Sequence, residues 1–342
     1  MRVYSSIDKF VFFLKGESIK EDFLSSDFKG LRTKDKTIFD SGALVISYYK
    51  RILKDISNIH YENEDSHILL YYDLDNLTHI VKVRFDELGL INSLVEEIYL
   101  KDYHTMVLVV SYDGSLFYGA QKQSSTKGLS TIQETIEKAL TTMTGFDIPI
   151  IMSSRTDRGV HALGQVVSFD SHSISPDKYK YALNNILPPS IRVKDAYLRS
   201  QLFNARYDVI KKTYQYIVDM GEYDLFKRNY CFFFKVRNIS KIRDELKCLV
   251  GTHDFSAFSK GHKENSIRTM YDASVHLSDN RLIFTFTSSG FLHNMIRLIV
   301  GSVLEIDRKG VGSLKAILDS KDNNQTPHLA PPEGLYLMSI TY

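Results

Sequence analysis

The sequence predicts an α+β protein, in which antiparallel strands and helices mix without the regular strand–helix repeat of a parallel sheet. Three observations predict this class. Some segments of strand length alternate apolar and polar residues, other segments repeat apolar residues at helical spacing, and no strand leads into a glycine-rich nucleotide-binding turn. With 342 residues, 43% hydrophobic and 25% charged, the chain has room for two or three folded domains.

Residues 1–103 predict a small accessory α+β domain of unknown role. The runs "HILLYYDL" and "HIVKVRF" flank Asp75-Asn76 as a hairpin, and Phe85–Leu100 places its apolar residues on one helical stripe. A short linker is expected at 101–103. Residues 1–102 carry 14 Lys/Arg against 18 Asp/Glu, a balance of −4, which disfavours direct binding to a polyanion. We therefore expect this domain to restrict access to a site or to meet a protein partner.

Residues 104–205 predict the first α+β half of a larger body. "TMVLVVSYDGS" is typical of a buried strand that ends in a turn at Asp113-Gly114. Ser130 and Gln133 form an expected capping box, and Gly145 is the expected end of the helix that follows. The remaining predicted elements are, in order, strand Ile148–Met152, strand Val166–Phe169 and a short helix in "YKYALNNILP".

Residues 206–342 predict the second half. Its expected elements are, in order, strand "KTYQYIVDM", helix "SKIRDELKCLVGTHDF" with a stop at Gly251, strand "RLIFTFTSSG", the apolar helix Phe291–Ile306 and strand "GLYLMSITY". The charge balance of residues 103–342 is +6, from 29 Lys/Arg and 23 Asp/Glu. A polyanion, if one binds, is expected to meet this part of the chain.

Several classes of protein are disfavoured. No apolar run approaches the roughly 18 residues of a membrane helix, and the N-terminus lacks the features of a signal peptide. Two cysteines cannot form a disulfide framework, so a reducing cytoplasm is expected. The histidines show no metal-binding spacing, so no metal site is expected.

The loop "SSRTDRGVHALGQVVSFD" places Asp157 between Arg155 and Arg158, with a predicted strand on each side. Two interpretations fit this pattern. Asp157 can cap an ordinary hairpin loop beside solvated arginines, or it can be a catalytic carboxylate held ionised within an anion-binding cleft.

Arg297 is a lone cation in a strongly apolar helix, where it falls on one line with His293 and Gly301. A buried guanidinium requires an anionic partner, and Asp157 is one candidate; the alternative is an arginine that extends to solvent. In "KKTYQY", Tyr214 and Tyr216 share one face of a strand beside Lys212. They can offer a platform for an unstacked base or can simply line a core.

These segments, in this order, resemble the tRNA pseudouridine synthase A family over about residues 104–342, whereas residues 1–103 resemble no family that we can name. The matching blocks are "SYDGSLFYGAQKQ", "LSTIQETIEKAL", "SSRTDRGVHALGQVVSFD", "FNARYDVIKKTYQY", "LVGTHDFSAFSKG", "SGFLHNMIRLIVGSVLEI" and "APPEGLYLMSITY". The block around Asp157 is the most specific of them.

The resemblance implies a fold, a reaction and a set of roles. The fold is two α+β halves whose antiparallel sheets join across a central basic cleft, commonly in a homodimer. The reaction isomerises uridine in RNA, most simply in the anticodon arm of tRNA, without a cofactor. The catalytic residues implied are Asp157, Tyr214, which stacks on the base, and Arg297, which pairs with Asp157. Asp157 could attack C1′, attack the base or abstract a proton.

Substrate-binding roles are expected for a further set of residues: Arg155, implied by the resemblance to act in flipping the nucleotide, together with Arg158, His161, Gln165, Arg206 and Lys212. Three positions depart from the family pattern, because Ala120 replaces an aromatic residue, Arg158 a small residue and Ser154 a glycine. These departures could change which RNA or which uridine is used. Two alternatives remain, namely the same chemistry on ribosomal or another RNA, and an inactive RNA-binding or folding factor.

Overall fold

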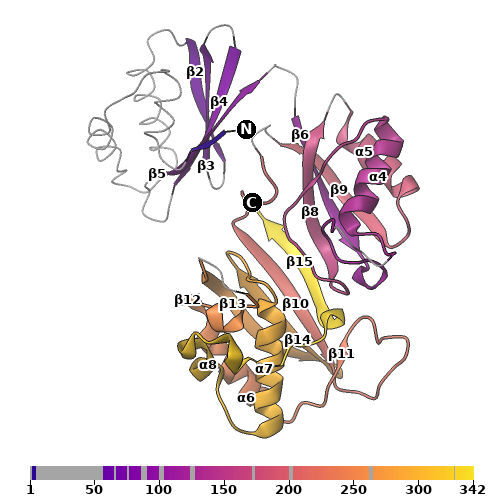
Figure 1. Cartoon of the computed structure of the whole chain (residues 1–342), viewed down its shortest axis with the longest axis vertical. Helices are drawn as coiled ribbons and strands as arrows, with labels where there is room; N and C mark the ends of the chain where they lie inside the picture. The colour runs from indigo at the N-terminus through magenta and orange to yellow at the C-terminus, as the bar shows by residue number, and fades with distance from the viewer. Residues whose placement is uncertain are drawn as a thin grey trace, which may run out of the picture. The chain divides into compact units, whose positions relative to one another are not determined.

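The computed structural model describes residues 2–4, 57–64, 67–74, 77–85, 91–99, 104–123, 128–171, 174–199, 203–261, 265–326 and 328–342. The chain divides into two compact units (Figure 1). The first comprises Met1–Thr105, Asp170–Ser173 and Arg199–Phe203, and the second comprises Met106–Phe169, Ile174–Leu198 and Asn204–Tyr342. The second unit therefore contains nearly all of both predicted halves.

The first unit contains a five-stranded antiparallel sheet in the order β1-β5-β4-β3-β2. Its strands are β1 (Arg2–Tyr4), β2 (Ser57–Glu64), β3 (His67–Leu74), β4 (Leu77–Phe85) and β5 (Ile91–Tyr99). Leu74 pairs with Leu77, which confirms the predicted hairpin. The described residues of this unit contain strands and no helix, and the linker predicted at 101–103 lies outside them.

The prediction of a helix over Phe85–Leu100 was wrong. Residues Ile91–Tyr99 form β5, which pairs with β4 on one side and with β1 on the other. The segment contains the β-branched residues Ile91, Val95 and Ile98, which suit a strand. Pairing with β4 and with the distant β1 satisfies the backbone hydrogen bonds of β5, and such contacts override a local helical spacing.

The second unit is α+β and is built on a ten-stranded mixed sheet. Eight of its strands follow the order β12-β13-β14-β10-β15-β8-β6-β9, while β11 pairs with β10 and β7 with β8. The strands are β6 (His104–Tyr112), β7 (Ile151–Met152), β8 (His161–Ser171), β9 (Ile191–Arg199), β10 (Lys211–Asp219), β11 (Phe232–Phe233), β12 (Gly251–Asp254), β13 (Ile267–Ser278), β14 (Arg281–Ser288) and β15 (Leu335–Thr341).

One sheet runs through both predicted halves. The halves join where β15 pairs with β8, with Tyr336 opposite His161 and Leu337 opposite Ala162. This pairing is parallel, as is that of β10 with β11, so the expectation of purely antiparallel sheets needs correction. The join places the loop before β8 beside the second half of the chain.

Five α-helices accompany this sheet in the described residues. Helices α4 (Ile132–Thr144) and α5 (Pro176–Ile186) lie beside β6, β8 and β9, and helices α6 (Ile239–Leu246), α7 (Met295–Lys309) and α8 (Leu314–Ser320) lie with the strands of the second half (Figure 1). The bounds of three of these helices differ from those that the sequence predicted.

Three predicted boundaries are corrected. The capping box at the start of α4 is formed by Thr131 and Glu134, one residue later than predicted, whereas Gly145 ends the helix in the left-handed conformation as expected. Helix α6 ends at Leu246, because a 3-10 turn and then strand β12, which starts at Gly251, take over the chain. Helix α7 begins at Met295 rather than at Phe291.

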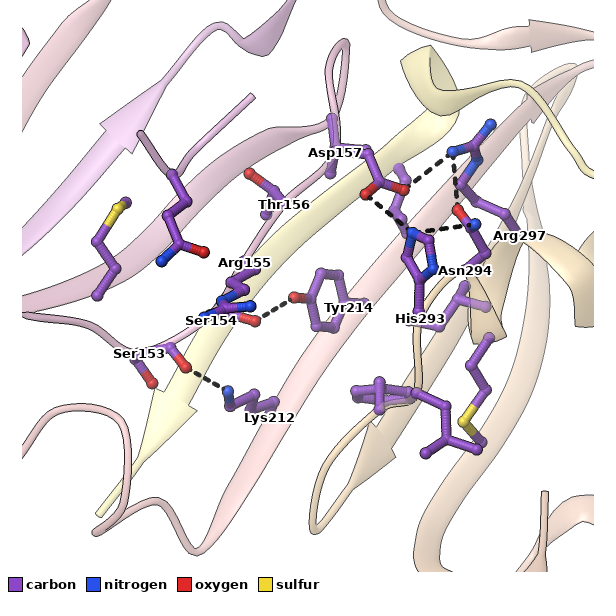
Figure 2. Close-up of a pocket in the computed structure, with 18 of the residues that line it drawn as sticks. Ser153, Ser154, Arg155, Thr156, Asp157, Lys212, Tyr214, His293, Asn294 and Arg297 are labelled. Atoms are coloured by element: carbon purple, nitrogen blue, oxygen red, sulfur yellow. Dashed lines mark hydrogen bonds and ion pairs between the residues drawn. The ribbon is translucent and has the colours of Figure 1, made fainter. Parts of the chain in front are cut away.

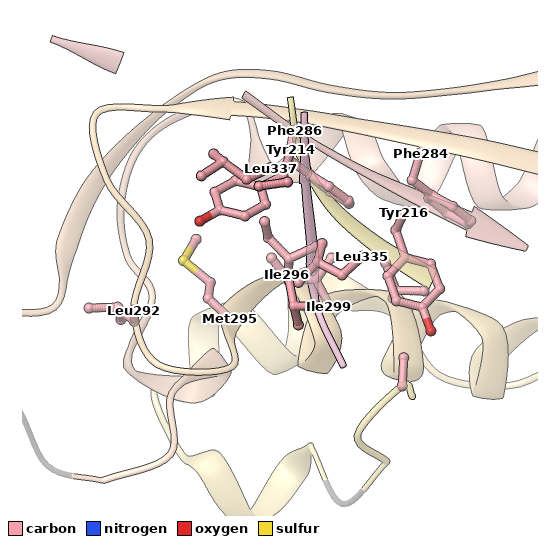
Figure 3. Packing of buried hydrophobic residues seen from close by; sticks show 14 of the residues in the cluster. Tyr214, Tyr216, Phe284, Phe286, Leu292, Met295, Ile296, Ile299, Leu335 and Leu337 are labelled. Atoms are coloured by element: carbon pink, nitrogen blue, oxygen red, sulfur yellow. The ribbon is translucent and has the colours of Figure 1, made fainter. Parts of the chain in front are cut away.

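The core of the second half packs α7 against the central strands (Figure 3). Tyr214 lies opposite Phe286 on β14 and Leu337 on β15, and all three side chains are buried. Ile296 and Ile299 of α7 belong to the same buried cluster. This packing fixes the distance between β10 and α7, the two elements that carry Tyr214 and Arg297.

Candidate active site

A cavity of about 990 Å³ opens in the second unit, around the loop between β7 and β8 (Figure 2). Asp157 is the one carboxylate among its lining residues in the described part of the chain. The cationic side chains that line it are Lys122, Arg155, Arg158, Arg206, Lys212, Lys260, Arg268 and Arg297. Such a wall attracts a polyanion, and it concentrates positive charge around a single acid.

The loop that carries Asp157 is held by close backbone contacts. The N–H of Gly159 donates to the carbonyl of Gly114 at 3.2 Å, and the N–H of Ala120 donates to the carbonyl of Thr156 at 3.0 Å. A side chain at Gly114 would collide with the Val160 carbonyl, since a Cβ there would lie 1.9 Å from its oxygen. Glycine at 114 therefore permits the approach that fixes the loop.

Asp157 forms the expected ion pair with Arg297. Nη1 of Arg297 lies 3.0 Å from Oδ2 of Asp157, and the arginine side chain is 12% exposed whereas the carboxylate is 38% exposed. The other carboxylate oxygen, Oδ1, faces Nε2 of His293 at 3.8 Å. Asp157 is thus oriented on one side and open to the cavity on the other, as a reacting carboxylate requires.

Two further contacts hold the guanidinium of Arg297. Its Nε donates to the carbonyl of Ala330 at 2.8 Å, and its Nη1 donates to Oδ1 of Asn294 at 3.1 Å. The segment that carries Ala330 can approach α7 because position 301 is glycine, where a Cβ would lie 2.0 Å from the His328 carbonyl oxygen. Gly301, found in line with Arg297 in the sequence, therefore serves to admit the acceptor of Arg297.

Tyr214 both lines the cavity and belongs to the core. It is 5% exposed, its ring meets Phe291 edge-on at 5.2 Å, and its hydroxyl lies 2.7 Å from Oγ of Ser154. Burial raises the pKa of the phenol above its usual range, so the ring stays neutral. Tyr216, on the same face, donates to the carbonyl of Pro331 and has no place in the cavity lining.

Gln165 supports the site from behind and does not line the cavity, contrary to the expected substrate contact. Its Nε2 donates to the carbonyl of Ser154 at 2.8 Å, and its Oε1 accepts from the N–H of Ser154 at 3.2 Å. Nε2 also approaches the hydroxyl of Tyr112, which in turn lies 2.7 Å from Oγ1 of Thr156. This buried chain of contacts fixes the residues on either side of Arg155.

His161 is likewise absent from the cavity lining, so a direct substrate contact is not supported. The imidazole is 2% exposed and stacks on Tyr336, with ring centroids 4.7 Å apart. Its Nδ1 accepts from the N–H of Gly114, which leaves Nε2 to donate to the Asn229 carbonyl at 2.8 Å. Burial lowers the pKa of His161, consistent with a neutral ring that ties the two halves together at the β8–β15 join.

Lys212 and Arg206 lie in one basic corner of the cavity. Nζ of Lys212 donates to the Ser153 carbonyl at 2.6 Å, and its pKa is lowered to about 8, first by burial and then by the charge of Arg206. Two cations that line the same cavity favour an anion there.

Arg155 and Arg158 are exposed and line the cavity as expected. The guanidinium carbon of Arg158 lies 5.4 Å from the centre of the Tyr118 ring. The other two residues that depart from the family pattern are Ala120 and Ser154. Ala120 is fully buried and outside the lining, whereas the Ser154 hydroxyl contacts Tyr214.

Sequence reasoning missed three contributors to the site, namely Asn294, Lys260 and Arg268. Asn294 adopts a left-handed conformation, with φ 62°, directly before α7, and the HN pair before an apolar helix was the available signal for it. Lys260 and Arg268 come from segments whose approach to the cavity depends on the β12–β13 hairpin. No local pattern marks them.

The described residues contain no group of three metal-ligating side chains, and no helix among them is long and apolar enough to cross a membrane.

Comparison with known proteins identifies the family. The family model described as tRNA pseudouridine synthase matches residues 108–208 and 246–342. A tRNA pseudouridine synthase A from Bacillus subtilis (strain 168) is 40% identical over 242 residues, which cover 68% of this chain and 97% of that protein. The protein of the same description from Exiguobacterium sibiricum is 42% identical over 239 residues, or 68% of this chain and 94% of the relative. The chain therefore belongs to the tRNA pseudouridine synthase family.

Proposed function

We propose that this protein converts uridine to pseudouridine in tRNA, with Asp157 as the catalytic carboxylate. The observation that carries the proposal is Asp157 itself, oriented by Arg297 at 3.0 Å and surrounded by cationic side chains in the cavity. Family membership supplies the reaction and the RNA class. The target site proposed is the anticodon arm, and ribosomal RNA is the alternative substrate.

The isomerisation exchanges bonds within one nucleotide. The N1–C1′ bond breaks, the uracil turns and C5 bonds to C1′, after which C5 loses a proton and N1 carries one. The arrangement supports a division of labour, in which Asp157 reacts, Arg297 orients it, and Tyr214 packs against the base once the nucleotide has left its stack. The basic wall balances the RNA phosphates, with Arg155, Arg158, Arg206 and Lys212 as proposed phosphate contacts.

The two halves of the second unit are proposed to enclose the RNA along this basic cleft in the cytoplasm, as a homodimer, with residues 1–103 as an accessory domain that can meet a partner protein. Support for the cleft comes from the cations that both halves contribute, Arg155 and Arg158 before β8, and Lys260 and Arg268 after β11.

Asp157→Asn tests the assignment, because it keeps the shape of the side chain and removes its charge. We expect pseudouridine formation in a tRNA transcript to fall to below about a hundredth of the wild-type rate, while tRNA affinity changes little. Asp195→Asn is the control, since Asp195 is exposed and lies outside the cavity lining. Residual turnover above a hundredth in Asp157→Asn would remove the carboxylate from the mechanism, and absence of pseudouridine with the wild-type protein on tRNA would reject the function.

A further inference from the structure

The turn Asn204–Asp208 is held by side-chain hydrogen bonds and exposes only Arg206 and Tyr207. Oδ1 of Asn204 accepts from the N–H groups of Arg206 and Tyr207 at 3.0 and 3.3 Å. Oδ2 of Asp208 accepts from the N–H of Asn204 at 2.9 Å, and both side chains are buried. Ala205 is anchored from two sides, by Oγ of Ser168 and by the hydroxyl of Tyr342. The backbone of this turn therefore has a defined place at the edge of the cavity.

The turn presents two exposed side chains to the cavity. Tyr207 is 57% exposed, and the guanidinium carbon of Arg206 lies 5.4 Å from the centre of its ring. Both residues line the cavity that holds Asp157. Within the described part of the chain, no hydrogen bond to the Tyr207 hydroxyl is formed, and the ring belongs to no buried cluster. An exposed aromatic ring on a rigid turn contributes little to folding, but it suits stacking against a planar ligand.

The surroundings of Tyr207 define the ligand. Arg206 and Lys212 both line this cavity, and the carboxylate of the cavity is engaged by Arg297. This part of the cavity thus combines two cations, which suit a phosphate, with an aromatic side chain that is 57% exposed, which suits a base. Tyr214 is 5% exposed deeper in the same cavity, so the two tyrosines offer separate platforms.

We infer that Tyr207 and Arg206 form a second nucleotide subsite, in which the base next to the target uridine, displaced from its stack, lies on Tyr207 while its phosphate lies against Arg206 and Lys212. The inference rests on the proposed function, because it requires a single-stranded RNA segment in the cavity. It adds a contact between the protein and the nucleotide next to the target uridine. Stacking of this kind tolerates any base but requires one to be present.

A cycle between protein and RNA tests the subsite. Full-length protein carrying Asp157→Asn, which blocks turnover, is titrated with tRNA transcripts that are intact or abasic directly 5′ or directly 3′ of the uridine that the wild-type protein converts. We expect one of the two abasic transcripts to bind about 5- to 150-fold more weakly. Adding Tyr207→Ala should weaken binding of the intact RNA by a similar factor. Tyr207→Ala combined with the abasic transcript should weaken binding by no more than either change alone.

Three variants make the test specific. Tyr207→Phe keeps the ring and should retain the affinity, whereas Tyr181→Ala removes a tyrosine that is 74% exposed on α5, outside the cavity, and should have no effect. Arg206→Ala should reduce the dependence of affinity on salt, which Tyr207→Ala should leave unchanged.

If the loss of RNA affinity caused by Tyr207→Ala adds to the loss caused by each of the two abasic positions, Tyr207 contacts neither base. That result would overturn the subsite while leaving the proposed function intact. If the wild-type protein converts no uridine in tRNA, the abasic positions are placed beside the uridines of the anticodon arm instead; a Tyr207-dependent loss of affinity at one of them would then support the subsite and reject the function.

Discussion

Replacing Arg297 with methionine removes three polar contacts while keeping most of the side-chain volume. The carbonyl of buried Ala330 loses the donor that lies at 2.8 Å, which costs about 1–3 kcal/mol for an acceptor left unpaired. Asp157 loses its partner but is 38% exposed, so water replaces much of that interaction and the loss resembles the roughly 0–1 kcal/mol of a surface pair. Together these give a loss of about 1–4 kcal/mol in the free energy of unfolding.

The effect on catalysis should be larger than the effect on stability. Without Arg297 the carboxylate is free to turn, and a misplaced reacting group can lose about a hundredfold in rate. We therefore expect Arg297→Met to lower both the urea midpoint and the rate of pseudouridine formation, and Arg297→Lys to restore charge without the contact to Ala330. Arg308→Met is the matched control, because Arg308 lies on the same helix with its side chain 54% exposed, and losing its surface ion pair with Glu305 should cost no more than about 1 kcal/mol.

A double-mutant cycle with Asp157→Asn isolates the pair. A coupling of about 0.5–1 kcal/mol in unfolding free energy is expected, at the lower end of the range typical of contacting residues, because water screens the 38% exposed carboxylate. If Arg297→Met behaves like Arg308→Met in both stability and turnover, the reasoning that a cation in an apolar helix needs its anion is refuted for this protein.

Three further outcomes are expected. Arg158→Ala should lower the salt dependence of tRNA affinity by about 0.7–0.9 in the slope of log K against log salt, whereas Arg237→Ala, an exposed arginine outside the cavity, should leave it unchanged; equal slopes would make Arg158 a solvated loop residue. The pKa of Lys212 is lowered to about 8, so its positive charge is lost as pH rises through that value, and tRNA affinity should fall between pH 7 and 9. Lys212→Arg should remove that decline, and an identical pH profile would exclude Lys212 as its source. A chain that begins at Lys101 should still form pseudouridine, with altered substrate choice or stability; a much weaker tRNA affinity at low salt would show that the acidic domain contacts RNA after all.

The need for an anion near Arg297 could be inferred from a general cost, whereas the choice of Asp157 as that anion came from the resemblance to the family. Arg297 lies in the first part of α7, where the residues around it from Met295 to Val300 are otherwise all apolar, and a cation there needs an anion. The same logic could not locate Asn294 or Arg268, because nothing in their own segments requires the contact that the tertiary structure supplies.

The strand β5 and the residues of β8 show two limits of local reasoning. The apolar spacing of Phe85–Leu100 fits a helix until β1 and β4 are available to pair with it. Strand β8 is buried on both faces over most of its length, so its hydropathy does not reveal which side chains face the cavity. His161 and Gln165 were therefore assigned to substrate when they in fact support the loop and the join.

The place of β15 in the sheet has a consequence for synthesis of the protein. The ribosome completes Asp157 long before it reaches Tyr336 and Leu337, yet these two residues pair with β8 and so bring the first half of the sheet to β10. Arg297, on α7, also emerges well after the acid it orients. A nascent chain shorter than about 337 residues therefore contains Asp157 before the two halves of the sheet are joined. Competence to modify RNA should switch on only after β15 has been synthesised, so that a shorter nascent chain on its ribosome leaves nearby RNA unmodified.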